Sequence, residues 1–329
     1  MDDNLPAANA PAGRNPAESK GTVVAALVAN LVVAVAKFLA AWRTGSSAML
    51  AEAIHSTIDT SNELLLLLGM HQSEQPPSAE RPFGHGRELY FWAFVVAVFI
   101  FAIGGGFSLY EGYEHLRHPA PLRDPTWNYA VLALGFLSDG ASFVIAWRTF
   151  GKQRGRRPFW RAFRISKDPS VFMVLFEDAA ALLGLLLAFL GVFLSHYFNR
   201  PDLDGMASMA IGVLLLLVAG LLLRETKSLL LGEPAEGKLL THIRELASSQ
   251  PTVQHVRPIL SSYLGPHEIL VVLPVEFTPD LSVGQLVEAT EHLRAAIKNC
   301  HPDVRHVFVQ PEGPQTPPLL PPAAGGARS

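Results

Sequence analysis

A polar stripe interrupts the second long apolar stretch of the sequence. Glu52, His55 and Asp59 are spaced three and four residues apart, and Asn62 and Glu63 continue the pattern. Residues three or four apart share one face of a helix, so this spacing places the polar side chains in one row. His55 and Asp59 lie about 6 Å apart along a helix axis, since each residue adds about 1.5 Å. One divalent ion between helices could bind both; the alternative is a polar seam that only packs helices.

Two adjacent carboxylates, Glu177 and Asp178, interrupt a later apolar stretch. Their side chains point about 100° apart on a helix, so one of them faces a given partner more easily. Ala181 and Gly184 lie on the same side as Asp178, where small residues let a neighbouring helix approach closely. We therefore expect Asp178 to face a metal ion and Glu177 to be a second ligand or a proton acceptor.

A third polar group, Ser138, Asp139 and Ser142, lies in the apolar stretch between these two. An ionisable group at membrane depth costs about 3 kcal/mol, which makes it a functional candidate by default. Two interpretations fit Asp139 equally well. It lines the same cavity as the other carboxylates, or it only holds a pair of helices together.

Six apolar windows carry these residues. A membrane-spanning helix needs about 20 predominantly apolar residues, and six windows meet this length: 21–42, 46–70, 89–116, 127–149, 170–196 and 205–230. The chain is 49% hydrophobic and only 17% charged, whereas about 25% charged residues is usual in soluble domains. The sequence therefore predicts a multi-pass integral membrane protein with an all-α six-helix transmembrane domain, residues 21–231, rather than a soluble helical bundle.

Basic residues are concentrated in alternate loops. The segment 148–167, between the fourth and fifth windows, contains eight Lys or Arg residues. Such segments face the cytoplasm and suit the anionic headgroups of the lipid bilayer. Both termini are therefore expected in the cytoplasm, in agreement with six spans, and the Ala/Arg/Pro-rich style of the chain favours a bacterial inner (plasma) membrane.

The chain changes character after residue 231. Its helix-like and strand-like segments follow the order αββαβ: 235–249, 253–264, 267–277, 282–299 and 303–310. Ser282 is a plausible N-cap of the second helix. This order predicts a small cytosolic α+β domain of ferredoxin-like type, residues 232–312, with helices on one face of a sheet.

The remaining features of the sequence exclude several classes of function. Residues 1–20 are polar and residues 313–329 are Pro/Gly-rich, so both are predicted to be disordered tails, and the first lacks the pattern of a cleaved signal peptide. A single Cys300 excludes an internal disulfide, and a net charge of -3 gives no reason to expect a nucleic-acid partner. We find no residue cluster typical of a membrane-embedded hydrolase, and we expect no enzyme.

Several histidines lie outside these motifs. His71 and His85 could bind a second ion at the membrane face, or they could be ordinary polar residues. Four histidines of the C-terminal segment lack a nearby Cys or carboxylate at ligand spacing and are expected to be surface residues: His255, His267, His301 and His306.

Four motifs in this order resemble the cation diffusion facilitator family: SSAMLAEAIHSTID (46–59), RPFGHGRELYFWAF (81–94), FEDAAALLG (176–184) and DGMAS (204–208). The resemblance covers about residues 20–310. It implies six helices with cytosolic termini, a homodimer, and export of zinc or a similar ion in exchange for protons. It implies no cofactor other than the transported ion itself.

The resemblance also implies a transport site. Two ligands come from an (Asp/His)-x-x-x-Asp motif on the second helix, which His55 and Asp59 match. Two more come from a (His/Asp)-x-x-x-Asp motif on the fifth helix, where Asp178 matches the second position but Val174, which cannot bind a metal, occupies the first. A Glu-Asp pair at this place resembles the divergent zinc transporter nine-like branch. The fourth ligand would be one of four groups: Glu177, Asp139, Asn62 or water.

Together with this resemblance, these residues predict a proton-coupled antiporter that exports a divalent metal cation, with the metal ligands His55, Asp59, Asp178 and Glu177. Imidazole and carboxylate ligands suit zinc, and Mn, Fe, Co or Cd also fit, whereas the lack of thiolates disfavours Cu(I). Metal ligands bind when deprotonated, so protons compete with the metal for the site. The alternative is a non-transporting membrane scaffold or metal sensor whose metal site is incomplete at Val174.

Overall fold

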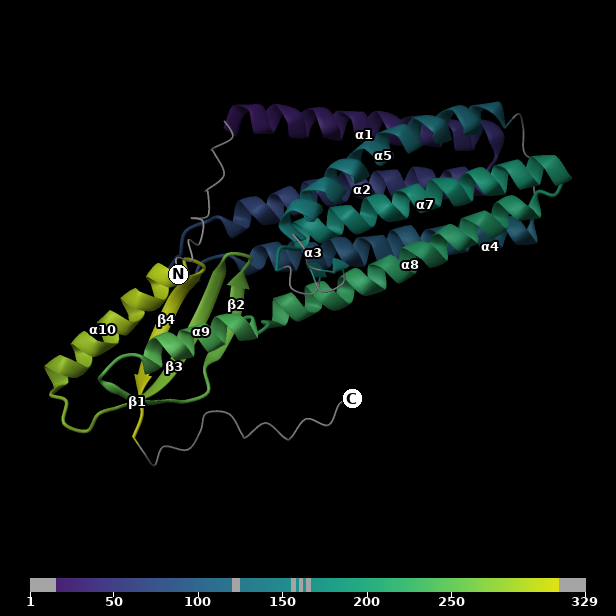
Figure 1. Ribbon diagram of the computed structural model, residues 1–329. Helices are drawn as coiled ribbons and strands as arrows, with labels where there is room; N and C mark the ends of the chain where they lie inside the picture. Colours follow the sequence, from purple (N-terminus) through teal and green to yellow (C-terminus); the bar gives the residue numbers. More distant parts are fainter. Residues whose placement is uncertain (1–15, 120–124, 155–157, 160–161, 164–166, 314–329) are drawn as a thin grey trace, which may run out of the picture.

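Figure 1 shows the computed structural model of the 329-residue chain, which describes residues 16–119, 125–154, 158–159, 162–163 and 167–313. The predicted C-terminal tail lies outside these residues except for Gly313, and residues 1–15 of the predicted N-terminal tail lie outside them as well. Helix α1 begins at Pro16, inside that predicted tail. A proline suits the first turn of a helix, because the N–H that it lacks has no partner there.

Six long helical segments run side by side in the described part of the chain (Figure 1). They are α1 (Pro16–Thr44), α2 (Ser47–Ser73), α3 (Arg87–Phe99) continued by the π-helical η1 (Ile100–Gly105) and α4 (Gly106–Arg117), α5 (Thr126–Arg154), α7 (Pro169–Phe198) and α8 (Asp202–Leu231). Four described segments are long and apolar enough to cross a bilayer: Arg87–Arg117, Thr126–Lys152, Phe172–Phe198 and Asp202–Leu231. The predicted helical membrane domain is confirmed. Two of the six predicted spans, α1 and α2, are not among these four described segments.

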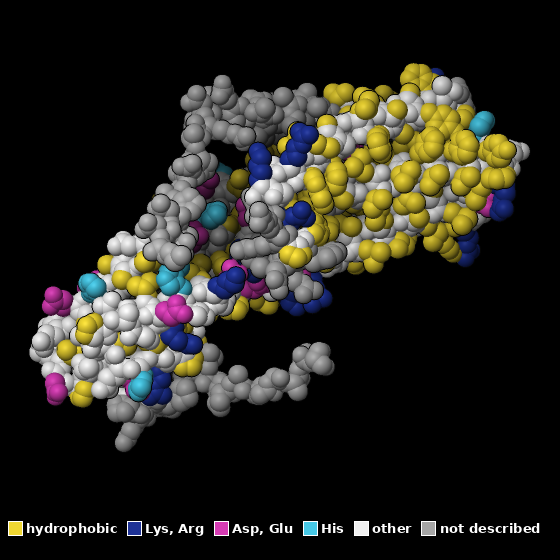
Figure 2. Space-filling view, viewed as in Figure 1, with side chains coloured by type: hydrophobic (Ala, Val, Ile, Leu, Met, Phe, Trp, Pro, Cys, Tyr) yellow, Lys and Arg dark blue, Asp and Glu magenta, His cyan; other side chains and the backbone are white. Residues whose placement is uncertain are grey.

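Apolar side chains cover much of the face of the helical part that Figure 2 shows. Trp42, Ile145 and Leu217 are 79%, 67% and 68% exposed, respectively. Soluble proteins rarely expose contiguous apolar surface of this kind. Lipid is the solvent that such a surface fits, and the protein is an integral membrane protein.

The third helical segment packs closely against α8. A Cβ atom added to Gly112 would lie 2.6 Å from the backbone nitrogen of Met209, and one added to Gly212 would lie 2.8 Å from that of Leu109. Small residues therefore let the two helices approach nearly to backbone contact, which is a common device in membrane bundles.

The C-terminal domain has the predicted arrangement, with one difference. Its elements are α9 (Gly237–Ser248), β1 (Val253–Val256), β2 (Leu260–Gly265), β3 (Glu268–Phe277), α10 (Val283–Cys300) and β4 (Val304–Pro311). The predicted first strand is divided into β1 and β2 around Pro258, because proline has no N–H to donate to a strand ladder. Ser282 caps α10, as predicted, in a reciprocal capping box with Gln285.

The long strand β3 organises this domain. It pairs with β1 and β2 along one edge, both antiparallel, and with β4 in parallel along the other. Ile243 of α9, Leu273 of β3 and Ile297 of α10 are buried in one apolar core. Both helices therefore pack on the sheet through that core (Figure 1).

Candidate metal centre

A small cavity of about 40 Å³ lies among α1, α2, α5 and α7, inside the helical part. An ion or a water molecule fits in such a volume, since about 10–15 Å³ is enough for one water. Its polar lining comes from all four helices: Asn30, Ser56, Asp59, Glu63, Asp139, Ser142, Glu177 and Asp178. Three of the four sequence-predicted ligands, Asp59, Glu177 and Asp178, therefore meet at one cavity.

His55, the fourth, is buried one helical turn before Asp59 on α2. Its Nδ1 lies 3.4 Å from Asp59 Oδ1 without hydrogen-bonding geometry. Among the described residues, neither ring nitrogen of His55 has a hydrogen-bond partner, and Asp59 Oδ1 has none. Most buried polar groups in proteins are paired, so atoms left unpaired beside a cavity are suited to an incoming ligand.

The two neighbouring carboxylates of α7 are held by different helices. Glu177 Oε1 accepts a hydrogen bond of 2.9 Å from Asn62 Nδ2 of α2. Asp178 Oδ2 accepts one of 2.9 Å from Ser142 Oγ of α5. Each side chain is thereby directed to its own side of the cavity, as the angle of about 100° between adjacent helical residues requires.

Val174 and Asp139 also line the cavity. Val174 presents an apolar group four residues before Asp178, where the family pattern has a ligand. Asp139 fits both interpretations offered by its sequence, because it lines the cavity and its Oδ2 lies 3.8 Å from the ammonium group of Lys37 on α1.

Lys37 is the residue of this region that the sequence analysis missed. It is fully buried, and its Nζ donates hydrogen bonds of 3.1 Å to Glu52 Oε2 and 2.6 Å to Ser56 Oγ. The signal that would have revealed it is a lone lysine in the middle of the first apolar window. A charge at that depth is expensive and calls for a partner.

The ligand candidates do not enclose an ion in this conformation. Among the described residues, no three His, Cys, Asp or Glu side chains converge closely enough to hold one. His55 does not line the cavity, whereas Asp59 does. To bind one ion together, the two α2 residues (His55 and Asp59) and the two α7 residues (Glu177 and Asp178) would have to move closer to each other.

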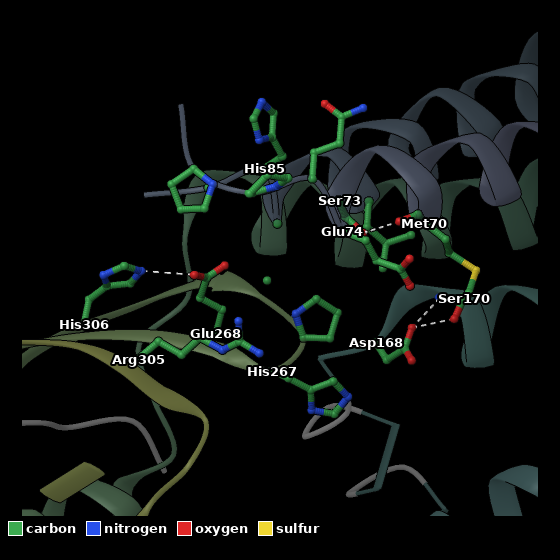
Figure 3. Close-up of a pocket in the computed structure, with 18 residues that line it drawn as sticks. Met70, Ser73, Glu74, His85, Asp168, Ser170, His267, Glu268, Arg305 and His306 are labelled. Atoms are coloured by element: carbon green, nitrogen blue, oxygen red, sulfur yellow. Dashed lines mark hydrogen bonds and ion pairs between the residues drawn. The ribbon is translucent and has the colours of Figure 1, made fainter. Parts of the chain in front are cut away.

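A larger cavity of about 720 Å³ lies where the helices meet the C-terminal domain (Figure 3). His85 lines it from the α2–α3 loop, and His306 lines it from β4, where its Nε2 lies 3.0 Å from Glu268 Oε1. The Gly-His-Gly-Arg loop touches the sheet directly, since a Cβ on Gly86 would lie 2.6 Å from the carbonyl oxygen of Leu264. His71 is exposed and does not line this cavity, so the structure does not bring His71 and His85 together there.

The other C-terminal histidines lie at the domain surface. His301 Nε2 contacts His242 Nδ1 at 2.9 Å, and His267 Nδ1 lies 3.6 Å from Asp303 Oδ1. Cys300 is exposed and forms no disulfide. Each of these contacts joins only two side chains. Among the described residues, no group of three or more possible ligands forms a metal site.

Comparison with known proteins identifies the helical part. Residues 23–231 match the family model described as "Cation efflux transmembrane domain". The chain belongs to the cation efflux family. The predicted resemblance to cation diffusion facilitators is thereby confirmed.

Relatives with established names point to the same branch. The chain is 33% identical over 243 residues to "Proton-coupled zinc antiporter SLC30A9, mitochondrial" of Mus musculus, covering 73% of this chain and 43% of that protein. It is 28% identical over 284 residues to "Metal tolerance protein C4" of Arabidopsis thaliana, covering 84% and 61%. It is 26% identical over 275 residues to "Magnetosome protein MamM" of Magnetospirillum gryphiswaldense, covering 82% and 81%. The chain thus spans less than half the length of the zinc antiporters it matches, and the predicted likeness to the zinc transporter nine-like branch is confirmed.

Proposed function

We propose that this protein is a divalent metal cation transporter that exports zinc from the cytosol in exchange for protons. The observation that carries the proposal is the cavity lined by Asp59, Glu177 and Asp178. The imidazole of His55, which makes no hydrogen bond to any described residue, lies one helical turn from Asp59. The relatives named as proton-coupled zinc antiporters support the choice of ion and counter-ion.

The proposed ligands are His55 and Asp59 of α2 and Asp178 and Glu177 of α7. One imidazole and three carboxylates suit zinc in tetrahedral geometry. Mn, Fe, Co and Cd accept the same donors, so the ion must be measured. Because the two pairs belong to different helices, closing α2 and α7 on the ion and parting them again would bind and release it.

Proton exchange follows from the same donor set. Metal ligands must be deprotonated to bind, so a proton arriving at one of them displaces the ion. Asn62 and Ser142 donate hydrogen bonds to Glu177 and Asp178 and thereby orient these carboxylates. Protons and the metal ion therefore use one set of atoms in turn.

The wider assembly belongs to the same proposal. We propose a homodimer in a membrane, with both termini and the α+β domain of residues 232–312 in the cytosol. The basic segment 148–167 supports this orientation. Relatives named as mitochondrial leave a mitochondrial membrane as an alternative to a bacterial inner membrane.

Metal uptake into proteoliposomes with an imposed pH gradient tests the proposal. Zn, Mn, Fe, Co and Cd are compared for the wild type, for Asp59→Asn, and for Asp202→Asn as a matched control at the half-buried start of α8, away from the cavity. We expect gradient-dependent zinc flux that Asp59→Asn abolishes and Asp202→Asn retains. A folded protein that moves none of the five ions would contradict transport and favour the membrane scaffold or metal sensor.

A further inference from the structure

Helix α1 places a buried cation at the wall of the cavity. The Nζ atom of Lys37 contacts Ser56 Oγ at 2.6 Å and lies 3.8 Å from Asp139 Oδ2. Both Ser56 and Asp139 line the cavity. The ammonium group is therefore one side chain away from the space in which the transported ion is proposed to bind.

The partner of this cation points elsewhere. Glu52 Oε2 accepts a hydrogen bond from Lys37 at 3.1 Å, but Glu52 does not line the cavity. Its Oε1 faces α7, where a Cβ on Gly184 would lie 2.3 Å away. The positive end of the Lys37–Glu52 ion pair is thus the end nearer to the cavity.

A buried ion pair such as this one is weak evidence for a stabilising role. Replacing a buried ion pair with well-packed apolar residues is often neutral or stabilising, because desolvating two charges costs much of what their attraction contributes. Two apolar side chains at positions 37 and 52 would pack α1 against α2 equally well. A lysine ammonium is a compact point charge on a flexible stem, and here it contacts two groups of the cavity wall.

We propose that the fixed positive charge of Lys37 lowers the affinity of the cavity for the transported divalent ion. It acts in part by holding Asp139 at the cavity wall. The inference rests on the proposed transport function. The fixed positive charge repels a dication and competes with it for the Asp139 carboxylate. A transporter must release its ion, and a lower affinity makes it easier for a proton to displace the ion from a site with several carboxylates.

Metal affinity of the neutral double variant Lys37→Gln/Glu52→Gln tests this role. The two amides can form a hydrogen bond between α1 and α2 and leave the net charge unchanged. Lys37→Gln alone would leave the buried carboxylate of Glu52 without its cationic partner. Zinc binding is measured on purified full-length protein by competition with a fluorescent chelator, and turnover is measured in proteoliposomes. Because the cation is nearer to the ion than Glu52 is, we expect zinc to bind at least about tenfold more tightly, with slower turnover.

A second variant tests the route through Asp139. Asp139→Asn is made alone and combined with the neutral double variant, since interacting residues give non-additive effects. We expect the gain in affinity caused by removing Lys37 and Glu52 to shrink when Asp139 is already neutral. Full additivity would overturn the part of the inference that assigns Asp139 a role.

The outcomes separate this inference from the proposed function. A wild type that binds and transports zinc, with a folded double variant of equal affinity and turnover, would show that Lys37 only supports packing and would overturn the inference alone. Weaker zinc binding by the double variant would overturn it as well. A wild type that binds none of the tested ions would overturn the proposed function, and the inference with it.

Discussion

Two buried polar regions of the helical bundle differ in how their groups are satisfied. At the turn between α1 and α2, Asp204 of α8 accepts hydrogen bonds from Ser46 Oγ (2.7 Å), from the backbone and side chain of Ser47 (2.6 and 3.0 Å) and from the backbone of Ala48 (3.3 Å). At the cavity, His55 has no hydrogen-bond partner among the described residues. Both residues are buried.

This difference separates a structural carboxylate from a binding group. Asp204 binds the first turn of α2, where unpaired N–H groups and the positive end of the helix dipole favour an anion. Its bonds are complete without any ligand. His55 and Asp59 have atoms without hydrogen-bond partners, which lowers the stability of the folded protein. This is expected of a site at which a ligand supplies the missing partner.

The largest effect should come from His55→Leu. Removing a proposed ligand should lower zinc flux by about two orders of magnitude or more, because even outer-shell partners of metal ligands are worth about 10–100-fold. The variant should melt close to the wild type, since an unpartnered buried polar group is replaced by an apolar one of similar size. Uptake into proteoliposomes and thermal unfolding check the two expectations.

His115→Leu is the matched control for this substitution. His115 is also buried, and its Nε2 has no partner among the described residues, but it lies on α4 and does not line the cavity. We expect its flux to match the wild type. If both histidine variants lost flux, a position beside the cavity would not be what distinguishes His55 from His115.

The reverse pattern is expected for Asp204→Ala. Loss of the bonds to Ser46, Ser47 and Ala48 leaves buried donors unpaired at the start of α2. The free energy of unfolding should fall by about 3 kcal/mol, measured by denaturation in detergent, while the folded protein keeps its zinc affinity. Asp202→Ala, two residues earlier and at the surface, should change stability by less than about 0.5 kcal/mol. A stable Asp204→Ala protein that binds zinc poorly would reverse the assignment.

The sequence predicts features that depend on neighbours along the chain. The helical spacing of His55 and Asp59 follows from the pitch of α2, and the N-cap at Ser282 follows from its residue type and its place before α10. The six apolar windows follow from the composition of each stretch. These features require no knowledge of which helices lie side by side.

The sequence does not predict the contacts between helices. Asn62 with Glu177, and Lys37 with Glu52, join residues 115 and 15 positions apart. Only the packing of α1, α2 and α7 decides these partners. For the same reason the sequence does not distinguish Asp204 from Asp59, although one has its bonds complete and the other has an oxygen unpaired.

A smaller effect is expected from Gly184→Ala, which tests how tightly the Lys37–Glu52 ion pair is packed. The new Cβ would lie 2.3 Å from Glu52 Oε1, so Glu52 must shift or α7 must move away. Overpacking of this kind costs about 1–3 kcal/mol. Gly220→Ala is the control, because no atom of the described residues outside its own stretch of α8 lies within 4 Å of the position of its Cβ. This variant should be neutral or stabilise α8 by about 0.5–1 kcal/mol. Equal melting of the two variants would show that Glu52 is free to move.

The smallest effect is expected for His242 and His301, a pair of polar residues outside the membrane. It tests whether polar groups that are less buried contribute less to stability than the buried ones of the helical bundle. Partial burial, and then the charge of His242, lower the pKa of His301, while Asp303 opposes the shift. The unfolded chain therefore binds a proton more readily than the folded one. Stability is complete above the unfolded pKa of about 6.5 and falls as pH drops toward the folded value.

Thermal unfolding of the full-length protein at about pH 7.5 and about pH 5.5, on either side of the unfolded His pKa, measures this contribution. His301→Gln should lose less stability than the wild type on acidification, by no more than about 2 °C in melting temperature, because solvent weakens interactions between exposed groups. His255→Gln, an exposed histidine on β1, should follow the wild type. If His301→Gln also follows the wild type, protonation of His301 contributes nothing to the pH dependence of stability. If the stability effect of His301→Gln were as large as that of Asp204→Ala, burial would not decide how strongly a polar group affects the stability of this protein.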